Sequence, residues 1–126
     1  MTEITIAAGE TALRAQLNNS PTAAKIVAAL PLEGEAVFWG EEIYFPIPVD
    51  AEEEPAARRD VEIGELAFWP VGNAFCIFFG PTPVSTTEKP RAFSPVNIVG
   101  KLCDDPEPLK TVPEGTVIRI SAGPGD

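Results

Sequence analysis

Apolar and polar residues alternate along the beginning of the chain. Ile4 and Ile6 are separated by a polar residue, and the apolar residues at positions 13, 15 and 17 repeat this period of two. Such alternation places the apolar side chains on one face of a β-strand. The segment Ala8–Gly9–Glu10 between the two runs is typical of a turn. The pattern therefore predicts a β-hairpin at the start of the chain.

A different period follows the hairpin. Ser20 stands directly before Pro21, an arrangement that is typical of a helix N-terminus. Apolar residues then recur at positions 23, 26, 27 and 30, which is helical spacing, and Pro31 ends the run. A helix this short is marginal in isolation. We therefore expect it to dock its apolar side on a sheet.

The rest of the chain is divided into short apolar runs bounded by Gly, Pro, Asn or Asp, and these predict further strands. Together with the hairpin they give about eight strands and one short helix, a set that favours a closed β-barrel over an open sheet. Two long loops are expected, at 50–55 and 80–95, and residues 122–126 are expected to be frayed. The further strands are expected at Glu35–Trp39, Glu42–Ile47, Glu65–Trp69, Ala74–Phe79, Val96–Leu102 and Thr116–Ser121.

Length and charge limit the possible partners. The 126 residues, 44% of them hydrophobic, fit a single domain spanning residues 1–126. The apolar runs are too short to cross a membrane, and no signal-peptide pattern begins the chain, so a soluble cytoplasmic protein is expected. A net charge of -10 repels phosphate backbones, which argues against nucleic acid as a partner.

Several kinds of catalytic and metal site are excluded by residue type. The chain has no histidine, which excludes a Ser/His/Asp triad, a Cys/His nucleophile and an HExxH zinc site. Cys76 and Cys103 lack CxxC spacing, and two free thiols are expected, with Cys76 buried in an apolar strand. The acidic run at 52–54 lacks the spacing of a calcium loop. No metal and no cofactor is predicted.

Three segments carry a resemblance to a known family. They are LNNSPTAAKIVAALP at Leu17–Pro31, FWGEEIYFPIPV at Phe38–Val49 and FSPVNIVGK at Phe93–Lys101. With the opening segment, they resemble a family of small bacterial and archaeal cyclophilin-like proteins of unknown function. The resemblance implies a cyclophilin-like closed β-barrel. In the larger superfamily, this barrel binds proline-containing peptides and isomerises the X-Pro bond.

The resemblance does not extend to the pocket of the prolyl isomerases. Those enzymes use an arginine, a phenylalanine-methionine-glutamine cluster and a histidine, whereas the only methionine here is Met1. Arg58 and Arg59 are not followed by Phe, Met and Gln at suitable spacing. The classical isomerase residues are therefore expected to be missing, and activity rests on analogy of fold alone.

Aromatic residues mark the candidate binding site. Along AFCIFFG, alternation is expected to turn Phe75 and Phe79 toward the core, and Cys76 and Phe78 toward a helix or a cleft. Trp39 and Trp69 each precede a turn, where the mouth of a barrel would open. Arg91 and Ser94 lie in the proline-rich loop, where Arg91 could clamp a carboxylate or carbonyl. The predicted ligand-binding residues are Trp39, Tyr44, Trp69, Phe78, Arg91 and Ser94.

Three functions remain open from the sequence. The first is a barrel that binds a peptide or a small ligand without chemistry. The second is an atypical peptidyl-prolyl isomerase with Arg91 as hydrogen-bond donor. The third is a small-metabolite enzyme, or a subunit of a larger enzyme, that uses Arg91 together with Glu41 or Glu42. These two glutamates are adjacent, so on a strand they point to opposite faces. Asn73 and Asn97 are expected either to hold a turn or bulge or to line a pocket.

Overall fold

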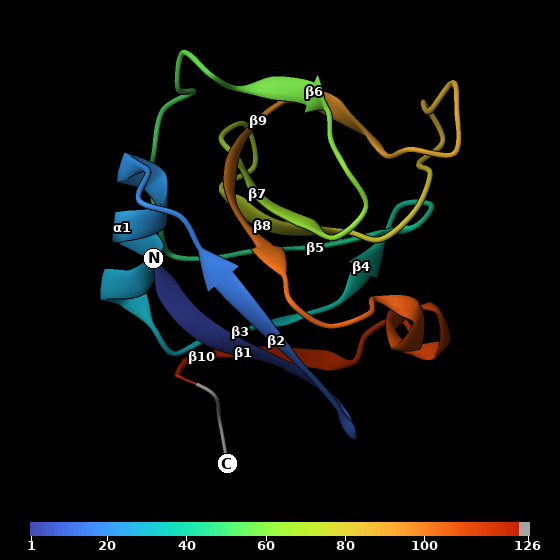
Figure 1. Ribbon diagram of the computed structural model, residues 1–126, viewed down its shortest axis with the longest axis horizontal. Coiled ribbons are helices and arrows are strands. Elements are labelled where there is room, and N and C mark those ends of the chain that lie inside the picture. Colours follow the sequence, from blue (N-terminus) through green and yellow to red (C-terminus); the bar gives the residue numbers. More distant parts are fainter. Residues whose placement is uncertain (124–126) are drawn as a thin grey trace.

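The computed structural model describes residues 1–123 and is mainly β (Figure 1). It contains a 10-stranded sheet, one α-helix and one 3-10 helix, which is more strands than the sequence predicts. No helix in this part of the chain has the length and apolarity needed to cross a membrane. The elements are β1 (Thr2–Ala8), β2 (Thr11–Leu17), α1 (Pro21–Ala29), β3 (Leu32–Glu35), β4 (Val37–Phe38), β5 (Glu42–Pro46), β6 (Arg58–Asp60), β7 (Glu65–Trp69), β8 (Ala74–Phe78), β9 (Arg91–Leu102), η1 (Glu107–Thr111) and β10 (Val117–Ala122).

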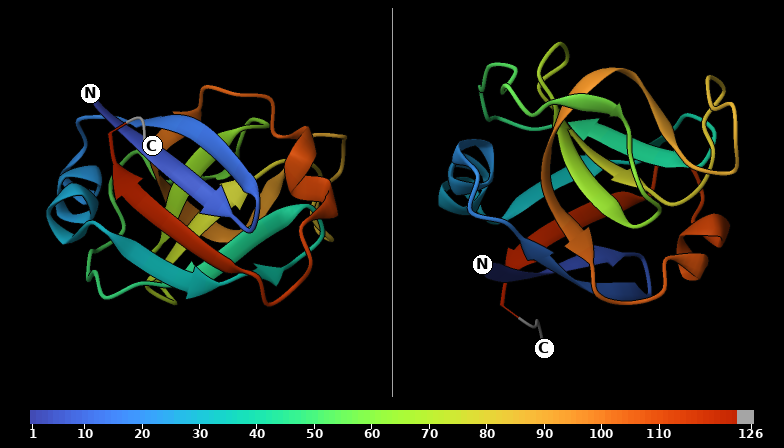
Figure 2. Two further views of the ribbon diagram at one scale, coloured as in Figure 1. Left: turned by 90° about the horizontal axis from the view of Figure 1, so that it is seen from below. Right: turned by 45° about the horizontal axis from the view of Figure 1, so that its top comes forward.

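The predicted hairpin and helix are both confirmed. Strands β1 and β2 pair antiparallel through a turn at Gly9, which has a φ of 62°. The Ser20 side chain accepts a hydrogen bond from the backbone N–H of Ala23, as expected of a helix cap. Helix α1 buries Ala23 and Ile26 in the core. It lies at one end of the curved sheet, and η1 lies at the opposite end (Figure 2).

The expected closed barrel is corrected to a strongly curved, open sheet. The strand order is β3-β10-β1-β2-β9-β7-β8-β5-β4, so β3 and β4 are edges that do not pair with each other. The physical reason lies at Ala36, between these two strands. Its backbone bonds to Gly115 and Thr116, after which the chain changes partner from β10 to β5. The curved sheet nevertheless surrounds a common interior (Figure 1).

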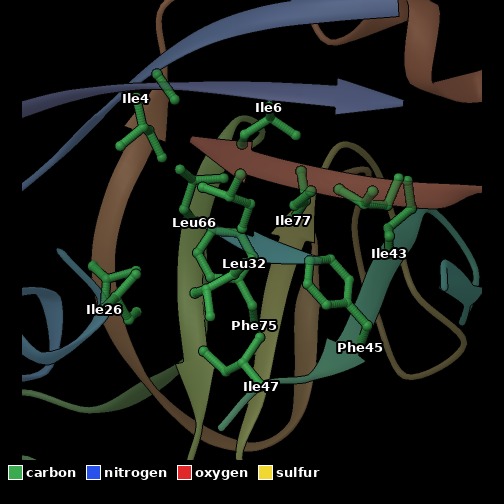
Figure 3. Close-up of a cluster of buried hydrophobic side chains, with 14 of the residues drawn as sticks. Ile4, Ile6, Ile26, Leu32, Ile43, Phe45, Ile47, Leu66, Phe75 and Ile77 are labelled. Atoms are coloured by element: carbon green, nitrogen blue, oxygen red, sulfur yellow. The ribbon is translucent and has the colours of Figure 1, made fainter. Parts of the chain in front are cut away.

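Apolar side chains from both halves of the sheet fill this interior (Figure 3). Phe75 and Ile77 from β8 belong to this main cluster, together with Phe45 from β5. The intervening residues Cys76 and Phe78 belong to a second, smaller cluster on the other face of the same strands. The alternation predicted for AFCIFFG is therefore confirmed. The second cluster also contains Ala67 from β7, Ala92 and Val96 from β9, and Val61, which directly follows β6.

Two of the expected irregular segments differ from the sequence prediction. The proline-rich loop ends at Pro90, because β9 begins at Arg91 and pairs with β6, β7 and β2 in turn. Strand pairing thus orders the segment 91–95, which the sequence predicts as loop. At the C-terminus, Ala122 belongs to β10 and pairs with Ile4. The fraying expected for residues 124–126 lies outside the described part of the chain.

Candidate functional site

A cleft of about 200 Å³ lies above the second cluster. Strand β5 contributes Glu42 and Tyr44, which alternation places on the same face of the strand. Trp39 follows β4, Trp69 ends β7, and the remaining lining comes from the start of β9. The site is thus built where ends of four strands, β4, β5, β7 and β9, lie together. Its lining residues are Trp39, Glu42, Tyr44, Trp69, Ala92, Phe93 and Val96.

Three aromatic rings form one wall of the cleft. The ring of Phe93 lies 6.0 Å from that of Trp39 and 6.2 Å from that of Trp69, in both cases nearly perpendicular, at 76° and 85°. Edge-to-face contacts of this kind are favourable. Phe93 is still 66% exposed, which is unusual for a phenylalanine in a folded domain. An exposed ring between two half-buried tryptophans indicates a surface suited to covering by another molecule.

The Trp69 ring is held in place by a hydrogen bond. Its indole Nε1 donates to the hydroxyl oxygen of Ser94, at 2.6 Å. The partner lies on β9 beside Phe93, so the same strand fixes two of the three rings. Trp39 is positioned differently, by a tight turn in which its N–H and C=O bond to the backbone of Glu42, at 2.9 and 3.2 Å. Gly40 supplies the φ of 61° that this turn requires.

Glu42 places a carboxyl group in this apolar cleft. The residue is only 6% exposed. Burial raises the pKa of the Glu42 carboxyl to about 7, and contact with the Cys76 thiol offsets a little of this rise. Within residues 1–123, no nitrogen or oxygen atom of another side chain forms a hydrogen bond with the carboxyl. The group is therefore available to a ligand, in a mixture of its neutral and charged forms near pH 7.

The neighbouring thiol is part of the floor beneath the cleft. Cys76 is buried, and its Sγ donates to the backbone oxygen of Ala74 at 3.8 Å. Burial, and then the nearby Glu42 carboxyl, raise the pKa of this thiol well above its usual value. A neutral, enclosed thiol is a poor nucleophile. Cys76 and Cys103 are both free, and Cys103 is exposed.

Three of the six predicted site residues line the cleft: Trp39, Tyr44 and Trp69. Ser94 is not a lining residue, but it forms a hydrogen bond to Trp69, which is one. Phe78 lies beneath the floor and is fully buried in the second cluster. The structure thus brings these five residues to one region, while their role in binding stays a prediction.

Arg91 is the predicted site residue that lies apart. It does not line the cleft but a separate surface hollow that includes Asp60, Glu62 and Lys89. Its Nε is 3.6 Å from Oδ1 of Asp60, an ion pair too long to be a hydrogen bond. Because Asp60 is largely exposed, this pair contributes little to stability.

Four lining residues are not among the predicted ligand-binding residues: Glu42, Ala92, Phe93 and Val96. The sequence suggests Glu42 only as a possible catalytic group beside Glu41, although its place on the same strand face as Tyr44 is a signal for the same site. As expected, Glu41 points elsewhere, and its side chain packs against Gly80. Phe93 could have been found from its position next to Ser94, had the segment 91–95 been recognised as a strand.

Asn73 and Asn97 have structural positions away from the cleft. Asn73 adopts a φ of 49° in the turn between β7 and β8. Asn97 is buried and donates to the Thr22 hydroxyl at 3.0 Å and to the Glu52 carbonyl at 2.9 Å, while its Oδ1 accepts from the Glu54 N–H at 2.8 Å. It therefore anchors the acidic 50–55 segment to the sheet and to α1. Across residues 1–123, no group of three or more His, Cys, Asp or Glu side chains is placed to hold a metal ion.

Comparison with known proteins identifies the family. The model of the family described as cyclophilin-like matches residues 2–121. The chain belongs to the cyclophilin-like family. The solution structure of a hypothetical protein from Archaeoglobus fulgidus is similar, with a TM-score of 0.82 and 34% identity, over 97% of this chain and 95% of that one. A comparison with curated proteins finds no match.

A second solved structure shares the fold at greater distance. It is that of McbB in complex with tryptophan, with a TM-score of 0.69 and 16% identity. The similarity covers 98% of this cyclophilin-like chain and 45% of McbB. At this identity, the likeness concerns the fold alone.

Proposed function

We propose that this cyclophilin-like chain is a binding domain whose aromatic cleft holds a small organic ligand. The observation that carries the proposal is the combination of three partly or largely exposed aromatic rings and a buried carboxyl without a nitrogen or oxygen partner among the described side chains, all in one hollow. Binding sites for small molecules are typically apolar, with a few well-placed polar groups. The Trp69–Ser94 hydrogen bond fixes the wall before any ligand arrives, which lowers the entropic cost of binding.

The size of the cleft favours a small molecule over an extended peptide. Its volume of about 200 Å³ is below the range of roughly 300 to 1,000 Å³ that is usual for drug-sized ligands. McbB, which shares this fold over 45% of its length, has a structure in complex with the small molecule tryptophan, and a small ligand here is consistent with that. The isomerase alternative has less support, because Arg91, the donor it needs, does not line the cleft.

Nuclear magnetic resonance tests the proposal directly. The chain has two tryptophans, both in the cleft, so their indole N–H resonances report occupancy. We expect at least one member of a panel of small neutral and charged organic fragments to shift these resonances saturably. Trp69→Phe should weaken that response, and Val117→Ala, an exposed position on β10, should not. A panel without any saturable, Trp69-dependent shift would contradict the proposal.

A second candidate function, acid-base catalysis on a small metabolite, is favoured by Glu42 alone. A carboxyl with a pKa of about 7 has the proton affinity that a general acid or base needs near neutral pH. Incubating the protein with a small-molecule extract, followed by mass spectrometry, tests this function. A compound should be consumed by the unmodified protein and not by Glu42→Gln. Identical profiles for the two proteins would exclude catalysis by this carboxyl.

A further inference from the structure

We propose, resting on the ligand-binding function above, that the ligand is a small organic cation. Its ammonium group, which carries apolar substituents, would lie against the rings of Trp39 and Trp69 and opposite the Glu42 carboxylate. The aromatic rings would hold the apolar substituents, and the carboxylate would neutralise the positive charge. It does not require any chemical step.

The aromatic wall is the first argument. Cations are attracted to the faces of aromatic rings, most strongly to tryptophan. Phe93 presents its ring at steep angles to both tryptophans, so the three rings that line this cleft do not form a flat stack. Sets of aromatic rings arranged in this way bind quaternary and methylated ammonium groups. A purely apolar ligand would not need tryptophan in particular.

The charge of the lining is the second argument. Among the cleft-lining residues of the described chain, Glu42 alone can carry a full negative charge near neutral pH, and none is Lys or Arg. The titratable groups that face it are Tyr44 on the same strand and Cys76 on β8, while β7 and β9 present only Trp69, Ala92, Phe93 and Val96. An anionic ligand would therefore meet no positive partner. A cation would supply the positive partner that the buried carboxylate otherwise lacks.

The charge of the whole chain is the third argument. With 19 acidic and 9 basic residues, the protein carries a net charge of -10. A potential of this sign raises the local concentration of cations and disfavours the approach of anions. The net charge of the protein and the Glu42 carboxylate inside the cleft thus both favour a positively charged ligand.

Cation binding should be coupled to the proton on Glu42. An adjacent positive charge stabilises the carboxylate, so binding releases a proton from the fraction that is protonated. With a pKa of about 7, roughly a tenth of the carboxyl is ionised at pH 6.0 and nearly all at pH 8.5. If only the ionised form binds, affinity increases about tenfold between these values.

Two probes of equal shape separate charge from size. Choline carries a trimethylammonium group, and 3,3-dimethylbutan-1-ol is its neutral carbon analogue. Isothermal titration calorimetry of the full chain at pH 8.5 should give choline at least a tenfold lower Kd than the alcohol, and that preference should shrink at pH 6.0. Glu42→Gln should lose the preference for choline. Glu41→Gln, which removes a carboxyl outside the cleft, should retain it.

These outcomes separate the proposal of a cationic ligand from the more general proposal that the cleft binds a small ligand. If the alcohol binds as tightly as choline, or if the preference survives in Glu42→Gln, the cation inference is overturned while the binding function stands. If neither probe binds at either pH, the cation inference is also overturned. The fragment panel followed by the two indole resonances then decides separately whether the cleft binds any ligand.

Discussion

Replacing Glu42 by glutamine should change how the stability of the protein depends on pH. The substitution keeps the shape of the side chain and removes its ability to ionise. In the folded protein, burial raises the pKa of the Glu42 carboxyl from its usual 4.5 to about 7. Below pH 4.5 the carboxyl is neutral in both folded and unfolded states, so it carries no ionisation penalty there.

The penalty develops as the pH rises. Between pH 4.5 and 7 the unfolded chain loses this proton while the folded protein keeps it, which favours unfolding, and above pH 7 the penalty levels off. One pKa unit corresponds to about 1.4 kcal/mol, so the full effect is about 3 kcal/mol, and roughly 2 to 3 kcal/mol of it develops between pH 5 and 8. Glutamine carries no such penalty at any pH.

Urea unfolding followed by tryptophan fluorescence measures this effect. The free energy of unfolding of Glu42→Gln, minus that of the unmodified protein, should increase by roughly 2 to 3 kcal/mol from pH 5 to pH 8. Taking the difference cancels the other 18 acidic residues, which both proteins share. Glu41→Gln controls for loss of a carboxyl at the neighbouring position. A difference for Glu42→Gln that does not change with pH would refute the reasoning.

Two further substitutions and one chemical treatment test the surroundings of the cleft. Asn97→Ala should lower the free energy of unfolding by about 1 to 3 kcal/mol in urea, because it leaves buried partners unsatisfied; an unchanged midpoint would contradict its anchoring role. Ser94→Ala should shift the Trp69 indole N–H resonance, and an unmoved resonance would rule out their hydrogen bond in solution. A thiol reagent should modify only Cys103 in the native protein and Cys76 only after unfolding; rapid reaction of both would show that Cys76 is accessible.

Local patterns in the sequence predict the parts of the fold that depend on local physics. The hairpin at Gly9, the helix cap at Ser20 and the alternation through Phe75 each depend on residues close in sequence. Strand β6 is different, because the segment Arg58–Asp60 has no apolar period and is a strand through its pairing with β9. The sheet stays open because the chain changes strand partner around Ala36, which no local pattern records.

The candidate site, too, is only partly predictable from local sequence patterns. Trp39 and Trp69 could be chosen because each precedes a turn at a strand end, which is visible in the sequence. The burial of Glu42 could not be predicted, since it arises only when Trp39, Trp69 and the start of β9 come together around the start of β5. The sequence predicts Arg91 at the same site as the tryptophans because it lies two residues from Phe93. In the strand that forms there, Arg91 instead lies beside Asp60.

The central claim is that Glu42 lies in an apolar cleft that binds a ligand. Carbon-13 nuclear magnetic resonance of the side-chain carboxyl, recorded against pH without and with saturating choline, measures this most directly. We expect the pKa of Glu42 to lie near 7 in the free protein and to fall when choline is bound. A pKa near 4.5 that choline leaves unchanged would contradict both the burial of the carboxyl and its role in binding.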